Sequence, residues 1–228
     1  MKTEDIENFR YEKKFVILEL EPCEIEYLIK NNPAMFSEIF YERRVNNIYL
    51  DSMDLKSYKE NLAGVSERTK IRIRWYGKIF GLIKKPILEL KIKKNELGRK
   101  LSFPLDSFIL DKNFSLELLR KVFLKSNLPR WLTEQLKLCH PTLLNSYKRK
   151  YFISSDKKHR ITLDKDQIFF RIKSGNNLFN EKIRDRKICI LEIKNLLKDY
   201  EKTKNITEYL PFRLVANSKY IKGIDLLE

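Results

Sequence analysis

The feature of this sequence that most restricts its fold is a two-residue alternation of charged and apolar side chains, which recurs in five separate segments. Because successive side chains of a β-strand point to opposite faces, each segment predicts a strand with one charged face and one apolar face. The segment KIRIRW at residues 70–75 is the clearest example. We therefore expect a fold built mainly from antiparallel strands. The other four segments are residues 10–17, 88–93, 160–164 and 191–194.

The remaining elements are predicted from turn residues and from apolar spacing typical of helices. Two amphipathic helices near the middle of the chain are expected to form an insertion at about 113–138 in a single domain of residues 1–228. The predicted strands are residues 10–20, 44–50, 66–76, 87–93, 98–103, 145–154, 160–164, 167–173 and 187–194, and the predicted helices are residues 24–30, 54–62, 116–125, 130–138 and 217–227.

The composition favours a globular protein with a polyanionic partner. Of the 228 residues, 43% are hydrophobic, which suffices for a core, and the formal net charge is +16. Such an excess of Lys and Arg indicates nucleic acid, an acidic membrane surface or a phosphorylated small molecule as the partner. Only six glycines are present, and none forms a glycine-rich phosphate loop. We expect side chains, rather than a P-loop or Rossmann turn, to hold any phosphate.

The cysteines and the chain start favour a soluble cytoplasmic protein. Cys23, Cys139 and Cys189 lie far apart and show neither the paired spacing of a zinc site nor a disulfide framework. Residues 1–10 are charged and lack the apolar run of a secretory signal, and no stretch reaches the roughly 18 to 20 apolar residues of a membrane span. The sequence thus predicts a reducing compartment.

The alternation is compatible with two arrangements of the sheet. The charged faces can point to solvent, with the apolar faces filling a core. Alternatively, the sheet can close with its charges inside, and helices at 24–30, 116–138 and 217–227 then cover the apolar faces. Periodicity alone leaves both arrangements open.

A set of eight segments, in order along the chain, resembles the catalytic domain of the vacuolar transporter chaperone (VTC) polyphosphate polymerases, within the triphosphate tunnel metalloenzyme (CYTH-like) superfamily. This resemblance covers nearly the whole chain. It implies an α+β fold with a closed antiparallel barrel of about eight strands, basic residues inside, helices outside and a C-terminal helix at the tunnel mouth. The segments are RYEKKF, NIYLDSMDLKSY, KIRIRWY, LELKIKK, SYKRKYF, RITLD, ILEIK and LVANSKYIKG.

The resemblance also implies the site residues. The catalytic residues would be Arg72, Arg74, Lys91 and Glu192, and Glu192 would bind a divalent Mn²⁺ or Mg²⁺ ion. Glu89 and Glu12 are left open between a metal contact and the orientation of nearby Arg and Lys side chains, and Asp164 could do the latter. Tyr147 and Tyr151 flank Arg149 on one face and are interpreted as neighbours of the substrate or as structural. The other phosphate-binding residues would be Arg10, Lys14, Lys70, Arg149, Arg160, Lys194, Lys219 and Lys222.

The implied activity is synthesis of polyphosphate from the γ-phosphate of ATP, with ATP and polyphosphate or pyrophosphate as partners. A triphosphatase is the main alternative, but superfamily triphosphatases usually carry two alternating glutamates before the lysine of the first strand. Here Arg10 occupies the first of these positions, ahead of Glu12 and Lys14. A non-catalytic binder of polyphosphate or nucleic acid is a further alternative. The eukaryotic relatives include a membrane segment that this chain lacks, so a separate membrane partner is envisaged.

Overall fold

The computed structural model describes residues 10–95, 97–173, 177–196 and 200–227. Two features organise them, a large antiparallel sheet and helices packed against both of its faces. The strands are β1 (Arg10–Ile17), β2 (Ser37–Asp51), β3 (Glu67–Tyr76), β4 (Gly81–Ile83), β5 (Ile87–Lys94), β6 (Leu97–Pro104), β7 (Phe108–Leu110), β8 (His140–Ile153), β9 (Arg160–Arg171), β10 (Lys182–Asp185) and β11 (Cys189–Leu196). The helices are α2 (Pro22–Lys30), α3 (Lys56–Leu62), α4 (Leu116–Lys125), α5 (Arg130–Lys137), α6 (Tyr200–Glu208) and α7 (Lys219–Leu227).

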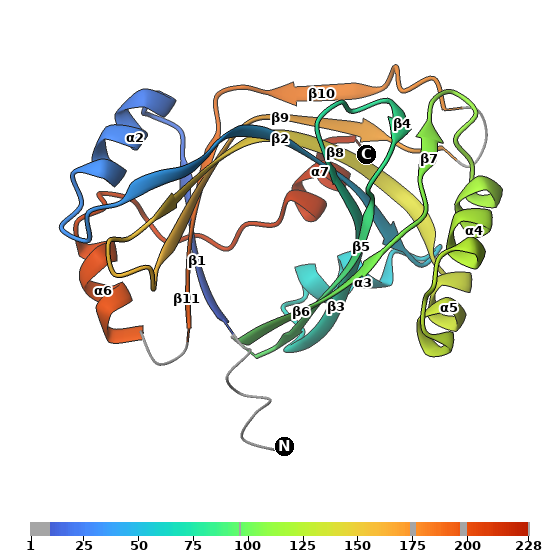
Figure 1. The fold of residues 1–228 in the computed structure, drawn as a ribbon, viewed down its shortest axis with the longest axis horizontal. Helices are drawn as coiled ribbons and strands as arrows, with labels where there is room; N and C mark the ends of the chain where they lie inside the picture. The colour runs from blue at the N-terminus through green and yellow to red at the C-terminus, as the bar shows by residue number, and fades with distance from the viewer. Residues whose placement is uncertain (1–9, 96, 174–176, 197–199, 228) are drawn as a thin grey trace.

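The main sheet curves around a common central space (Figure 1). Its strands follow the order β10-β9-β11-β1-β6-β5-β3-β2-β8, and β8 also pairs with β9. Every pairing is antiparallel. Between β1 and β6, however, the described residues contribute a single registered pair, Arg10 with Gly98. The antiparallel α+β fold is confirmed, but the expectation of a fully closed barrel is not, because no continuous ladder joins β1 to β6.

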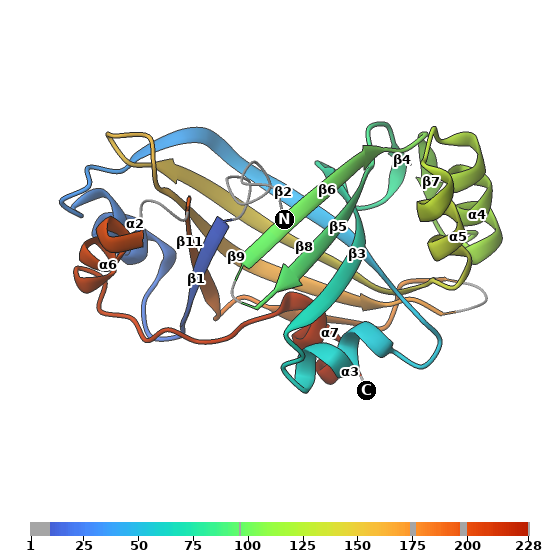
Figure 2. The ribbon, with the colours of Figure 1, turned by 90° about the horizontal axis from the view of Figure 1, so that it is seen from below.

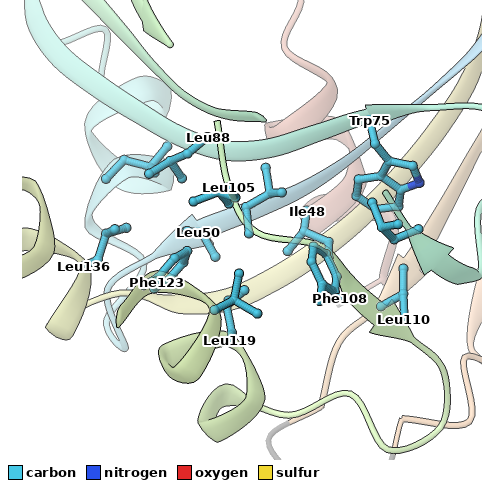
Figure 3. Close-up of a cluster of buried hydrophobic side chains, with 14 of the residues drawn as sticks. Ile48, Leu50, Trp75, Leu88, Leu105, Phe108, Leu110, Leu119, Phe123 and Leu136 are labelled. Atoms are coloured by element: carbon cyan, nitrogen blue, oxygen red, sulfur yellow. The ribbon is translucent and has the colours of Figure 1, made fainter. Parts of the chain in front are cut away.

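One apolar face of the sheet is covered by α4 and α5 (Figure 3). Ile48, Ile73 and Leu88 come from three neighbouring strands and are fully buried beneath residues of these helices such as Leu119 and Leu136. Each such side chain contributes about 1.5–3 kcal/mol when it is removed from water. The predicted helical insertion therefore forms one of the two outer covers of the sheet.

The second outer cover packs over β1, β8, β9 and β11. Ile25 and Ile29 of α2 are fully buried against apolar residues of these strands, and Ile206 of α6 joins the same cluster. Helix α2 matches the helix predicted at residues 24–30. Helix α6 was not predicted, because residues 200–208 contain only two apolar side chains, too few to show a helical period.

Helix α7 packs on the opposite, inner face of the sheet, so the expectation that residues 217–227 cover an outer apolar face is wrong. Tyr220 stacks on Tyr49 with ring centroids 5.0 Å apart. In register, Tyr49 lies opposite Arg72, on the charged face. The hydroxyl of Tyr220 also donates to Asp51 at 2.6 Å, so two contacts of Tyr220 anchor the helix. Figure 2 shows α7 beside α3 at one end of the sheet.

Several strands differ from the expected bounds. Strand β2 begins at Ser37, ahead of the predicted residue 44, because bulges near Phe40 interrupt the two-residue period. Residues 160–164 and 167–173 belong to one strand, β9, in which Asp166 adopts a positive φ of 51°. The short strands β4, β7 and β10 were not predicted, since three or four residues carry too little pattern.

No helix among the described residues is long and apolar enough to cross a membrane. The three cysteines are free thiols, and Cys189 is buried in the cluster beneath α2.

Gly223 allows α7 to approach the sheet closely. A Cβ atom at this position would lie 2.6 Å from Cδ1 of Phe169 and would also collide with Leu143. We expect Gly223→Ala to lower the free energy of unfolding by about 1–3 kcal/mol, because the core must shift to admit a methyl group. Urea denaturation measures this change.

Leu226→Ala is the control for this prediction, because Leu226 lies on α7 but is 40% exposed. We expect it to change the free energy of unfolding by about 0.5 kcal/mol or less. Equal stability of Gly223→Ala and the unmodified protein would contradict the close packing of α7.

Candidate functional site

A cavity of about 90 Å³ lies on the inner face of the sheet and is lined mainly by cations. Of the residues predicted to bind phosphate or metal, nine line it, and Glu192 is the one carboxylate among its described lining residues. This cavity is called the inner cavity below. The cations that line it are Lys14, Lys70, Arg72, Arg74, Lys91, Arg149, Lys194 and Lys219.

The inner cavity continues into a wider opening of about 530 Å³, called the mouth below. Lys14, Lys70 and Lys91 line both spaces. Arg68 and Lys93 add further cations to the mouth. An anion entering from solvent therefore meets positive charge before it reaches the inner cavity.

Glu89 holds two of the predicted catalytic arginines in place. Its Oε2 accepts from Arg72 Nε at 2.8 Å and lies 3.5 Å from Arg74 Nη1, while Lys100 Nζ lies 2.9 Å from Oε1. Burial alone would raise the pKa of Glu89, but Arg72, Arg74 and Lys100 outweigh it and hold that pKa far below its usual range. Both carboxylate oxygens of Glu89 are therefore engaged by cations, a geometry that fits the orienting role of the two left open for it.

Glu192 lies among lysines from neighbouring strands and is only 6% exposed. Lys194 Nζ lies 3.5 Å from its carboxylate, and Arg149 Nη2 lies 3.7 Å from it. Burial opposes ionisation, but Lys194, Lys14 and other nearby cations keep the pKa of Glu192 well below its ordinary value. This carboxylate is therefore ionised at neutral pH.

Glu12 lies opposite Lys194 across the β1–β11 pair, two residues along the strand from Lys14, which lies opposite Glu192. The Glu12 carboxylate is 2.5 Å from Lys91 Nζ and 3.7 Å from Lys194 Nζ. Lys194 therefore contacts both glutamates. The sequence left the role of Glu12 open, and the structure gives it a strong ion pair with a predicted catalytic lysine.

Asp164 joins Arg149 to the C-terminal helix. It receives two hydrogen bonds from Arg149, at 2.5 and 2.7 Å, and lies 2.5 Å from Lys219 Nζ. Tyr147 lies beneath both cations, with Lys219 Nζ 4.6 Å from its ring centroid. The predicted orienting role of Asp164 fits this geometry, and the predicted neighbourhood of Tyr147 and Arg149 is present.

Two of the predicted residues, Lys222 and Arg160, are not among the described residues that line the inner cavity. Lys222 forms an ion pair of 2.5 Å with Asp185, although it lies on the same helix as Lys219. Arg160 is exposed and registers with Ile153 on β8. The side chain of Arg10 lies outside the described part of the structure.

Sequence reasoning missed the polar residues that link α7 to the mouth. The carbonyl oxygen of Asn217 accepts from Lys14 Nζ at 3.2 Å, and Ser218 Oγ lies 2.9 Å from Lys70 Nζ. Both residues precede the helix in the NSKYIKG segment. Only the two lysines of that segment matched a motif, so the motif gave no reason to select its neutral members.

The charges around the inner cavity favour an anion with several negative charges. Its eight lining cations face Glu192 and three further carboxylates, which pair with them from the cavity wall. The formal excess is therefore four positive charges when all eight cations, Lys70 included, are protonated. The three further carboxylates are Glu12, Glu89 and Asp164.

A divalent metal fits this site only when it shares its coordination with a ligand. The described residues contain no group of three acidic, His or Cys side chains that could hold an ion by themselves. Glu192 and Glu12, however, both contact Lys194 Nζ, at 3.5 and 3.7 Å, so the two carboxylates flank one ammonium group. Mg²⁺ is commonly bound by one or two carboxylates together with substrate phosphates and water, and this pair matches that requirement.

Comparison with known proteins identifies the family. The profile of the VTC domain matches residues 9–228, which is nearly the whole chain. This chain belongs to the VTC domain family. The predicted resemblance is confirmed, and the family suggests dependence on a divalent metal. No curated protein matches the sequence at a significant level.

Solved structures with little sequence identity share the fold of this VTC domain. A putative adenylate cyclase from Vibrio parahaemolyticus has a TM-score of 0.53 and 10% identity, with 96% of this chain and 98% of that chain covered. A putative adenylyl cyclase from Hippeastrum, described as having a dominant triphosphatase activity, has a TM-score of 0.53 and 13% identity, with 96% of each chain covered. A protein from Pyrococcus horikoshii has a TM-score of 0.53 and 14% identity, with 95% of this chain and 98% of that chain covered.

Lys70 differs from Lys91, Lys194 and Lys219 of the VTC domain site, whose Nζ atoms pair with carboxylates. Its own Nζ contacts the hydroxyl of Ser218. Burial, together with repulsion from Lys14 and Lys91, lowers the pKa of Lys70 to about 6. Its amine is therefore about half deprotonated near pH 6 and largely neutral above that pH in the free protein. A bound phosphate favours the charged amine, so binding is coupled to uptake of a proton.

We expect the affinity for tripolyphosphate to fall between pH 6 and 8 relative to the Lys70→Arg variant, by up to about tenfold per pH unit. Arg remains charged over this range, which removes the proton uptake. Calorimetric titrations of both proteins at each pH measure the difference, and the ionisation of the ligand itself cancels in the comparison. Parallel pH profiles for the two proteins would contradict the assignment.

Proposed function

We propose that this VTC domain transfers the γ-phosphoryl group of ATP to the end of a growing polyphosphate chain. The observation that carries the proposal is the inner cavity, whose lining cations outnumber the carboxylates that pair with them, as a triphosphate ligand requires. Phosphoryl transfer needs positioning and charge neutralisation more than covalent chemistry from the protein. The cavity supplies both through fixed guanidinium and ammonium groups.

Arg72 and Arg74 are oriented before substrate arrives. Glu89 fixes both guanidinium groups, and Arg74 Nε also donates to Asn47 Oδ1 at 3.0 Å. Guanidinium groups held in this way can grip the oxygens of a phosphoryl group without reorganisation. We assign them to the transferred γ-phosphoryl group.

The remaining phosphate oxygens near Glu192 would be neutralised by three lysines of the inner cavity, Lys14, Lys91 and Lys194. A divalent metal held by Glu192 and Glu12 would supply further charge neutralisation at the phosphates. An oxygen of the terminal chain phosphate forms the new bond to the γ-phosphorus, while the bond to the β,γ-bridging oxygen breaks and ADP leaves. The chain gains one phosphate, and no enzyme nucleophile takes part.

Hydrolysis of a triphosphate is the second candidate, supported by the activity named for the Hippeastrum protein. It requires a carboxylate free to orient water. Glu12 is held at 2.5 Å by Lys91, and Arg10 occupies the position of the other glutamate that superfamily triphosphatases usually carry. This arrangement favours a phosphate acceptor over water.

The products formed from ATP with Mn²⁺ or Mg²⁺ distinguish the candidates. We expect ADP and a polymer of phosphate, resolved by gel electrophoresis and by ³¹P spectroscopy. Monophosphate or pyrophosphate without polymer would instead identify a hydrolase. Binding of polyphosphate or nucleic acid without turnover would leave only the binding function.

Glu192→Gln is expected to reduce turnover by about 100-fold or more, because the substitution removes the buried carboxylate from the cations and from the metal. Glu67→Gln is the matched control, since Glu67 is a largely exposed carboxylate on β3 and pairs with Lys94. The two variants are compared by ADP release, with circular dichroism to verify folding. Undiminished turnover by a folded Glu192→Gln protein would remove Glu192 from the mechanism.

A further inference from the structure

Arg43 lies on the inner face of the sheet, beyond the inner cavity. It registers opposite Arg149 across the β2–β8 pair, so the two side chains share a face. Three aromatic rings surround its guanidinium group, with centroid distances of 4.2 Å to Phe40, 4.8 Å to Tyr151 and 5.3 Å to Tyr76. Tyr151 also contacts Arg149, at 5.9 Å, and therefore connects this cluster to the inner cavity.

The charge of Arg43 is not neutralised by a carboxylate within the described chain. Its Nε is buried and has no hydrogen-bond partner there. In contrast, Arg72, Arg74 and Arg149 each pair with a carboxylate. Aromatic faces attract a guanidinium group but leave its net charge in place. Arg43 therefore keeps its capacity to bind an anion.

The cluster lies at the end of the strands opposite the mouth. Lys70 lines the mouth, and six residues further along β3 Tyr76 contacts Arg43, a separation of about 20 Å along an extended strand. Phe40 and Tyr76 are 51% and 48% exposed, so the cluster borders solvent. The exposed Arg160 lies toward the same end, opposite Ile153.

Irregular pairing in β2 brings Phe40 and Arg43 together. Residues three apart on a regular strand point to opposite faces. The register of β2 against β8 shifts between Glu38 and Phe40 and again between Phe40 and Arg43. Such shifts redirect side chains and are frequent beside functional sites.

We propose that Arg43, within the ring formed by Phe40, Tyr76 and Tyr151, is a second anion site that binds a polyphosphate chain extending past the inner cavity. This inference rests on the proposed function, because it names where the longer ligand continues. Arg43 exchanges its contacts with the rings for contacts with phosphate oxygens when a chain reaches it. A nucleic acid strand is disfavoured, since the ring faces on which bases would stack are directed at Arg43.

Calorimetric binding of tripolyphosphate and of long-chain polyphosphate, without ATP, tests the proposal. Tripolyphosphate reports on the inner cavity, and only the long chain can reach Arg43 as well. We expect Arg43→Gln to bind tripolyphosphate within about twofold of the unmodified protein and long chains about five- to tenfold more weakly. The slope of log affinity against log salt for long chains should decrease by about one.

Two further variants separate charge from packing. Arg43→Lys keeps the charge but loses the planar guanidinium, so it should bind long chains more weakly than the unmodified protein and more tightly than Arg43→Gln. Arg184→Gln removes an arginine that is 43% exposed on β10, and it should leave both affinities unchanged. Long-chain affinity that is lost equally in Arg43→Lys and Arg43→Gln would reduce Arg43 to a packing role and overturn the proposal.

Other outcomes are equally decisive. Unchanged long-chain binding by Arg43→Gln, or an equal loss for both ligands, would overturn the second site while leaving the proposed function in place. A single-stranded oligonucleotide that binds more tightly than polyphosphate, and depends on Arg43, would overturn the ligand class. Failure of the unmodified protein to bind either phosphate ligand would overturn the proposed function and this inference together.

Discussion

The pairing of buried cations with fewer buried carboxylates on one sheet face is the interaction on which the rest of this structure depends. An isolated charge is costly to bury, whereas a paired and hydrogen-bonded one is tolerated. Asp164 makes this possible for Arg149 and Lys219, and Glu89 does so for Arg72. Because the charged face is turned inward, the apolar face must be covered from outside, and the helix pairs α2/α6 and α4/α5 provide that cover.

The same pairing prepares the site for phosphate chemistry. Carboxylates fix the directions of the guanidinium groups, so a phosphate that enters replaces water and not a disordered side chain. They do not cancel the positive charge, because the cations outnumber them. The same contacts therefore contribute both to stability and to anion binding. Lys70 belongs to this set, and its ammonium group donates to the hydroxyl of Ser218.

Strand identity was predictable from residues such as those at 70–75, where the period of two is unbroken. Whether the charged faces point inward or outward was not predictable from the pattern, because the two-residue period is the same in both cases. The family resemblance favoured the inward direction. Arg43 was not predicted as a site residue, because irregular pairing of β2 interrupts the two-residue alternation around it. Lys219 and Lys222 share a helix, but their partners, Asp164 and Asp185, belong to different strands, which spacing alone does not reveal.

The attachment of α7 has a consequence for how the protein assembles. The hydrogen bond between Tyr220 and Asp51 joins residues 169 positions apart, and Lys70 meets Ser218 across 148 positions. Contacts between such distant points of a chain are slow to form, because a large loop must close first. Most neighbouring strands pair through shorter loops, but β1 and β11 join residues as far apart as Lys14 and Glu192, 178 positions along the chain. Docking of the C-terminal helix and pairing of β1 with β11 are therefore both expected late in folding, and the anion-binding cavity is completed only with them.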